Sequence, residues 1–147
     1  MTDYRIAIAS SAEDIRHCFP VMRELRTHFK DADSFVKQVQ RQQKQGYQLA
    51  FIESDGDVRA VAGYRFLESL FSGKNLYVDD LVTRERDRSK GFGAQLLDWL
   101  IGQARERGCE SLELDSGVQR FDAHRFYFSK RMSISSYHFR IKIDQEA

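Results

Sequence analysis

The sequence has few of the features that mark secreted, membrane-bound or disulfide-stabilised proteins. Its two cysteines, Cys18 and Cys109, lie far apart and form no Cys-x-x-Cys pair. Neither a disulfide framework nor a metal site is expected, and this cysteine usage is typical of the reducing cytoplasm. No apolar run approaches the roughly 20 residues that a membrane-spanning helix needs. The first residues carry no apolar signal-peptide segment, so we expect a cytoplasmic protein without a membrane partner.

An excess of charge of one sign is also missing. The 23 Lys and Arg residues balance 22 Asp and Glu residues, which leaves a formal net charge of +1. Such a chain has no overall positive field with which to hold nucleic acid, so any anion must be bound locally. What is present is a globular composition, with 41% hydrophobic residues, 11 Phe and 6 Tyr. Residues 1–147 are therefore expected to form a single domain around one core.

The spacing of apolar residues changes along the chain and predicts an α/β fold with a mixed sheet. Ser10 and Glu13 form a capping box before a helix that begins at Ser11, and Pro20 should kink or split that helix. Strands are expected at 5–9, 48–53, 59–67, 76–83, 110–115 and 133–143, and helices after residue 11, after a cap at residue 33 or 34, after residue 93 and at 121–130. The order β-αα-βββ-α-β-α-β predicts a mostly antiparallel sheet with a central parallel pair, flanked by helices.

One segment carries a motif with a clear physical role. A polar loop follows the strand at 76–83 and leads into a helix through Arg88-x-x-Gly91-x-Gly93. Glycines at a helix start let the backbone approach a ligand, and the unpaired first-turn N–H groups carry the positive end of the helix dipole. Arg88 and Lys90 add cationic donors. The segment predicts a local phosphate or pyrophosphate site, although the glycines could instead serve only close packing of helix on sheet.

The chain resembles the GNAT superfamily of N-acetyltransferases over nearly its whole length. The resemblance rests on the order of elements, on the family's signature (Arg or Gln, then x-x-Gly-x-Gly or Ala) as Arg88-Ser-Lys-Gly-Phe-Gly93, and on Leu81-Val82-Thr83 before it. It also rests on Ala123-His-Arg-Phe-Tyr127, which is similar to the family's A-x-x-x-Y helix. Two positions depart from the pattern: Arg120 stands where the family often has asparagine, and Met132-Ser133 where it often has Gly-Phe.

The resemblance implies acetyl-CoA as the co-substrate. In the family, the strand before the loop splays from the next parallel strand, and pantetheine pairs with its backbone; Leu81, Val82 and Thr83 match those positions. A backbone N–H near Val82 would polarise the thioester carbonyl. The loop amides would hold the pyrophosphate, and the matching residues are Arg88, Ser89, Lys90, Gly91, Phe92, Gly93 and Ala94.

The resemblance assigns one residue as the acid, whereas the base has several candidates. Tyr127 matches the family's proton donor, whose phenol can protonate a leaving thiolate. Asp79 and Asp80 are adjacent carboxylates within an apolar strand, and we favour Asp80 as the base; Asp79, Glu68 or a water molecule are the alternatives. The plainer interpretations are that Tyr127 is a core aromatic and that both aspartates are held in ion pairs.

The expected activity is transfer of an acetyl group from acetyl-CoA to a primary amine of a small molecule or peptide, by direct attack on the thioester. The alternative is a domain of the same fold that binds or senses acyl-CoA without turnover, and Tyr127 in register favours the enzyme. The segments 15–46 and 68–75 would choose the acceptor, but they do not identify it. The open edge of the last strand, at 137–143, would suit a homodimer.

Overall fold

The computed structural model describes residues 3–144 and divides into two units, one that runs to Leu114 and one that begins at Asp115. The first unit contains β1 (Arg5–Ile8), α1 (Ala12–Leu25), α2 (Ala32–Gln43), β2 (Gln48–Ser54), β3 (Asp57–Ser69), β4 (Gly73–Thr83), the short 3-10 helix η1 (Glu85–Asp87), α3 (Phe92–Glu106) and β5 (Ser111–Leu114). The second unit contains α4 (Phe121–Ser129). Within residues 3–144, no helix combines the length and apolar content needed to cross a membrane.

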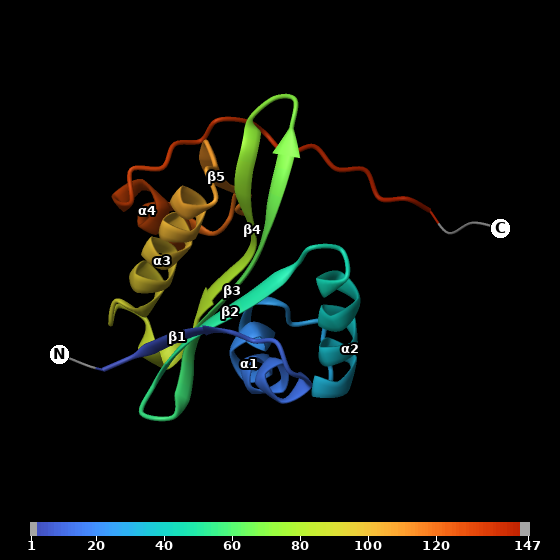
Figure 1. Cartoon of the computed structure of the whole chain (residues 1–147), viewed down its shortest axis with the longest axis vertical. Coiled ribbons are helices and arrows are strands. Elements are labelled where there is room, and N and C mark those ends of the chain that lie inside the picture. Colours follow the sequence, from blue (N-terminus) through green and yellow to red (C-terminus); the bar gives the residue numbers. More distant parts are fainter. Residues whose placement is uncertain (1–2, 145–147) are drawn as a thin grey trace. The chain divides into compact units, whose positions relative to one another are not determined.

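The strands of the first unit form one mixed sheet in the order β1-β2-β3-β4-β5 (Figure 1). Strands β1 to β4 pair antiparallel, whereas β4 and β5 pair parallel. Asp55 and Gly56, at φ of 54° and 80°, make the tight turn between β2 and β3 that the Asp-Gly signal predicts. The α/β fold with a mixed sheet is therefore confirmed, although the parallel pair lies at one end of the described sheet and not at its centre.

Helices cover both faces of this sheet. On one face, α1 and α2 pack on the strands through a core that includes Ile15, Val36 and Val61. On the other face, the Tyr64 ring of β3 meets the Trp99 ring of α3 edge-to-face, with 6.1 Å between centroids. Figure 1 shows α3 on the side of the sheet opposite to α1 and α2.

The ends of the first two helices differ slightly from the prediction. Ser11, and not Ser10, caps α1, because its hydroxyl accepts a hydrogen bond of 3.1 Å from the Asp14 amide. Asp31 caps α2 by accepting from the Ser34 amide at 2.8 Å. Pro20 does not split α1, which runs unbroken from Ala12 to Leu25. The neighbours of Pro20 on the helix are buried in the core, and this packing offsets the hydrogen bond that proline cannot make.

Strand β4 has two irregularities that position the site. Its register against β3 shifts at Gly63 and Tyr64, which pair with Asp80 and Val78, so Asp79 is an extra, bulged residue. Its pairing with β5 ends at Val78, where β5 itself ends. Within residues 3–144, the second half of β4 therefore has a strand neighbour on the β3 side only.

The second unit corrects one prediction. The strand expected at 133–143 does not form, and residues 132–144 adopt neither helix nor strand. Alternation of apolar residues is only a pattern; a strand also needs a hydrogen-bonded neighbour, and no described strand pairs with this segment. The homodimer argument, which depended on the edge of that strand, loses its basis. The apolar side chains of the segment are 69% to 91% exposed: Ile134, Tyr137, Phe139, Ile141 and Ile143.

Candidate active site

The loop between β4 and α3 has the geometry of an anion site. Helix α3 begins at Phe92, and its N-cap is Gly91 at φ of 92°, a left-handed conformation that glycine adopts without strain. No side chain caps this helix start, and its first turn has no acidic residue. Ser89 is also left-handed, at φ of 68°. Unpaired amides at a helix start can bind an anion, which is the role that the sequence motif predicts for this loop.

The predicted binding residues differ in how far their side chains are exposed. Arg88, Ser89, Lys90 and Gly91 are exposed, whereas the ring of Phe92 is buried and only its backbone can face a ligand. On the strand, Val82 is buried in the core in the same way. Leu81, Thr83, Gly93 and Ala94 are partly exposed.

The edge of β4 that faces away from β3 is available beyond the end of β5. Leu81, Val82 and Thr83 pair with β3 on one side, through Ala62, Val61 and Ala60. In the described part of the chain, no strand pairs with the other side of these residues. Their backbone can therefore accept an extended ligand that runs along the strand toward the loop.

The β4 bulge brings two adjacent carboxylates to the same face of the sheet. Asp80 accepts a hydrogen bond of 2.8 Å from Nε of Arg26 on Oδ1, and one of 2.7 Å from the Tyr47 hydroxyl on Oδ2. Asp79 accepts on Oδ2 from Nε of Arg65 at 2.8 Å, and the Arg65 guanidinium lies 5.4 Å from the centroid of the Tyr47 ring. Alternation along a regular strand would have separated the two side chains; the extra residue removes that separation.

Burial raises the pKa of two groups in this cluster, Asp79 and Tyr47. Burial raises the pKa of Asp79, partly opposed by its hydrogen bond from Arg65. Burial, together with the charge of Asp80, raises the pKa of the Tyr47 phenol well above its ordinary value. Tyr47 is therefore a protonated donor that holds one oxygen of Asp80.

Comparison with known proteins identifies the family of the chain. The sequence model of the acetyltransferase (GNAT) family matches residues 11–132. The chain belongs to this family.

It is 38% identical over 133 residues to the uncharacterized N-acetyltransferase YhdJ of Bacillus subtilis, over 89% of this chain and 93% of that protein. A stretch of 63 residues is 40% identical to the aminoalkylphosphonate N-acetyltransferase of Salmonella typhimurium, over 43% of this chain and 40% of that protein. The solved structure of the aminoglycoside N-acetyltransferase AAC(6')-Iy in complex with CoA has the same fold, with a TM-score of 0.83, 11% identity, and coverage of 97% of this chain and 96% of that one. The protein is thus a GNAT N-acetyltransferase, and its family uses acetyl-CoA.

The tyrosine of the A-x-x-x-Y helix lies in α4 of the second unit. Tyr127 is half-buried, and burial raises the pKa of its phenol. The Arg120 guanidinium opposes this rise by its charge and by a hydrogen bond to the phenol. Arg120 stands where the family often has asparagine. The proposed acid, Tyr127, therefore has a positively charged guanidinium as its hydrogen-bond partner.

Sequence reasoning did not single out several residues that shape the site. Arg26, Tyr47 and Arg65 had no motif, and only contacts between distant segments reveal them. Gly63 was the available signal, since an isolated glycine inside a strand often marks a bulge or a close approach. Glu68, an alternative base, is exposed on β3 outside this cluster. Within residues 3–144, no group of three or more His, Cys, Asp or Glu residues is placed to hold a metal ion.

Proposed function

We propose that this N-acetyltransferase moves the acetyl group of acetyl-CoA to a primary amine of a small molecule or peptide. The observation that carries the proposal is the course of β4. Its edge is unpaired by β5 after Val78, and it leads to the uncapped start of α3. The amides of pantetheine would pair with Leu81 to Thr83, and the pyrophosphate would lie at the loop from Arg88 to Ala94.

The reaction is a direct transfer. The amine nitrogen attacks the thioester carbon, so that a C–N bond forms and the C–S bond breaks. A backbone N–H near Val82 stabilises the developing negative charge on the carbonyl oxygen. The amine loses one proton, and the departing thiolate takes up one proton from the Tyr127 phenol.

The amine's proton goes to the carboxylate pair, and the contacts favour Asp79 over Asp80 as the group that accepts it. Both oxygens of Asp80 are already engaged, by Arg26 and Tyr47. Asp79 accepts a hydrogen bond from Arg65 on Oδ2, and burial raises its pKa, which makes its carboxylate a stronger base. Asp80 then serves to hold this part of β4, and with it the adjacent Asp79, in position through its contacts with Arg26 and Tyr47.

The test is turnover of acetyl-CoA with a panel of amines, measured by release of free thiol. The panel contains an aminoalkylphosphonate, an aminoglycoside, an amino acid, a polyamine and a peptide with a free N-terminus. Saturable thiol release that depends on one of these acceptors supports the proposal. If no amine supports turnover while CoA still raises the melting temperature, the domain binds acyl-CoA without transfer and the proposal fails.

A further inference from the structure

A buried carboxylate that the proposed transfer does not use lies in the loop before α3. Asp87 ends η1 and is 1% exposed. Its Oδ1 accepts from Nη1 of Arg59 at 2.9 Å and from Nζ of Lys90 at 3.2 Å, and its Oδ2 accepts from Nε of Arg84 at 2.5 Å. A buried charge is costly unless it is paired in this way, and here three cations share one carboxylate.

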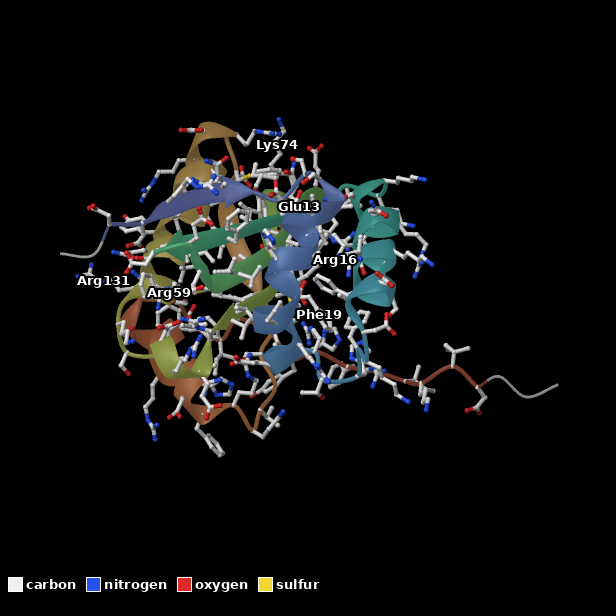
Figure 2. The ribbon with its side chains drawn as sticks, turned by 90° about the horizontal axis from the view of Figure 1, so that it is seen from below. Glu13, Arg16, Phe19, Arg59, Lys74 and Arg131 are labelled. Carbon is white, nitrogen blue, oxygen red and sulfur yellow. The ribbon has the colours of Figure 1, made fainter. Side chains whose placement is uncertain are left out.

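The same contacts join the loop to the body of the sheet. Arg59 projects from β3, as Figure 2 shows, and donates from Nε and Nη2 to the Ser54 carbonyl at 3.1 and 3.0 Å. Its guanidinium lies 5.7 Å from the centroid of the Phe92 ring, at the first residue of α3. The Arg84 amide donates to the Arg59 carbonyl at 2.7 Å. Asp87 is therefore the point at which the β2–β3 turn, the loop and the start of α3 meet.

The positive charges around Asp87 outnumber its single negative charge. Arg59, Arg84 and Lys90 supply three positive charges to the one negative charge of Asp87. Arg59 and Arg84 also approach Asp55 and Asp57, but only at 3.9 Å and at carboxylates that are 86% and 57% exposed. Water screens such exposed pairs, so the loop keeps a local excess of positive charge next to the helix start.

The backbone of the loop between η1 and α3 must also be held in place by its surroundings. Ser89 and Gly91 are both left-handed, and a left-handed serine is retained only where its surroundings hold it. The Asp87 carbonyl accepts from the Lys90 amide at 3.3 Å, while the Asp87 carboxylate holds the Lys90 ammonium. One residue thus fixes both the backbone and the side chain of Lys90.

We propose that Asp87 is a positioning residue for the pyrophosphate of the acetyl donor, and that it acts by holding Lys90 and the 88–91 backbone in their binding arrangement. The inference rests on the proposed function. It assigns a task to a residue that carries a charge opposite to that of the site. It predicts that loss of the Asp87 carboxylate weakens the binding of those ligands that contain the pyrophosphate, and of no others.

The experiment compares two acetyl donors with Asp87→Asn. With acetyl-CoA, KM is expected to rise by about 10- to 100-fold, the range for loss of one charge-assisted hydrogen bond, while kcat at saturation stays within a few-fold. With S-acetyl-N-acetylcysteamine, a thioester without nucleotide or pyrophosphate, kcat/KM is expected to stay unchanged. The matched control is Asp55→Asn, the same change at an exposed carboxylate near the same Arg59. It should leave kcat and KM unchanged with both donors.

Two results would overturn the inference. An equal loss with both donors would mean that Asp87 only supports the fold, and an unchanged KM for acetyl-CoA would mean that it does not position the site. If Asp87→Asn does not fold, Lys90→Gln takes its place, because Lys90 is largely exposed and the proposed effect passes through it. An unchanged KM for acetyl-CoA in Lys90→Gln would then reject the inference.

Failure of the proposed function is separately visible. If the wild type turns over no amine, the affinity for CoA is measured by calorimetry in wild type, Asp87→Asn and Asp55→Asn. A loss of about 10- to 100-fold in Asp87→Asn alone supports the positioning role even without catalysis. Equal affinity in all three rejects it.

Discussion

The Tyr47 hydroxyl donates to Asp80 Oδ2 at 2.7 Å across the α-carbon of Gly63. A Cβ at residue 63 would lie 1.8 Å from the Tyr47 hydroxyl oxygen and 2.5 Å from Asp80 Oδ2. Both distances are far below van der Waals contact, so glycine at this position is what allows the two side chains to meet. The contact joins Tyr47, the residue before β2, to the bulged part of β4.

Gly63→Ala is therefore expected to displace Tyr47 or Asp80. The crowding of a well-packed site should cost about 1–3 kcal/mol in the free energy of unfolding, measured by urea titration. Gly102→Ala is the matched control, because a Cβ on that α3 residue meets nothing within 4 Å. It should raise the stability by about 0.5–1 kcal/mol, since alanine favours a helix over glycine. Equal effects at the two positions would show that the Tyr47–Asp80 contact does not depend on Gly63.

The sequence predicts most of the fold because its patterns are local. Alternation and capping residues locate the strands and helices, and the Arg88-x-x-Gly91-x-Gly93 signature locates the loop. The carboxylate pair could not be placed in the same way, since a bulge at Asp79 depends on how β3 and β4 pair. The segment at 133–143 failed for a related reason: its alternation is local, but a strand requires a partner that no pattern supplies.

Loss of the loop geometry should remove binding of the acetyl donor. In Gly91→Val, a branched side chain is placed at φ of 92° in the loop where we propose that the pyrophosphate lies. CoA affinity, measured by calorimetry, should fall by more than about 100-fold, beyond the loss of one charge-assisted hydrogen bond. Arg88→Ala should be milder, at about 10-fold, because the backbone amides remain.

The control for backbone strain lies at the other end of α3. Gly108 has φ of 71° and, like Gly91, has nothing within 4 Å of an added Cβ. Gly108→Val carries a similar strain, of about 1–3 kcal/mol, away from the loop. Its CoA affinity should match that of the wild type. Equal losses in the two valine variants would mean that strain, and not the loop, causes the effect.

The two aspartates should differ in the pH dependence of turnover. Asp79→Asn removes the proposed proton acceptor, so kcat/KM should fall by about 10²–10⁴-fold near neutral pH. Its activity should then recover as the pH rises, because more of the amine is already neutral in solution. Asp80→Asn should keep the shape of the wild-type profile, whatever its absolute rate. The opposite pattern would assign the proton to Asp80.

Removal of the Tyr127 hydroxyl should slow the step in which thiolate leaves. Tyr127→Phe is expected to lower kcat by about 10²–10⁴-fold with little change in the affinity for acetyl-CoA. Because burial raises the pKa of this phenol above its ordinary value of 10.0, the wild type should not lose activity through Tyr127 up to about pH 10. Tyr137→Phe, at a tyrosine that is 84% exposed, is the control and should be fully active. Full activity in Tyr127→Phe would show that the thiolate leaves without this acid.

The buried Asp87 carboxylate should leave a signature in acid unfolding. Burial opposes its ionisation, but hydrogen bonds from Arg84, Lys90 and Arg59 outweigh burial and lower its pKa from 3.8 to about 2. A pKa that is lower in the folded state stabilises the fold above the unfolded pKa, and this contribution is lost as the pH falls from about 4 to about 2. The depression corresponds to about 2 kcal/mol.

Asp87→Asn cannot ionise at residue 87 and lacks this component. Its free energy of unfolding should be well below that of the wild type at pH 5, and the difference should shrink by about 2 kcal/mol at pH 2. Urea titrations at several pH values, followed by the fluorescence of Trp99, the single tryptophan, provide the measurement. Asp55→Asn, at an exposed carboxylate that approaches Arg59 only at 3.9 Å, is the control and should differ little from the wild type at pH 5. A constant difference between Asp87→Asn and the wild type would mean that the three cations do not hold the Asp87 charge as the contacts indicate.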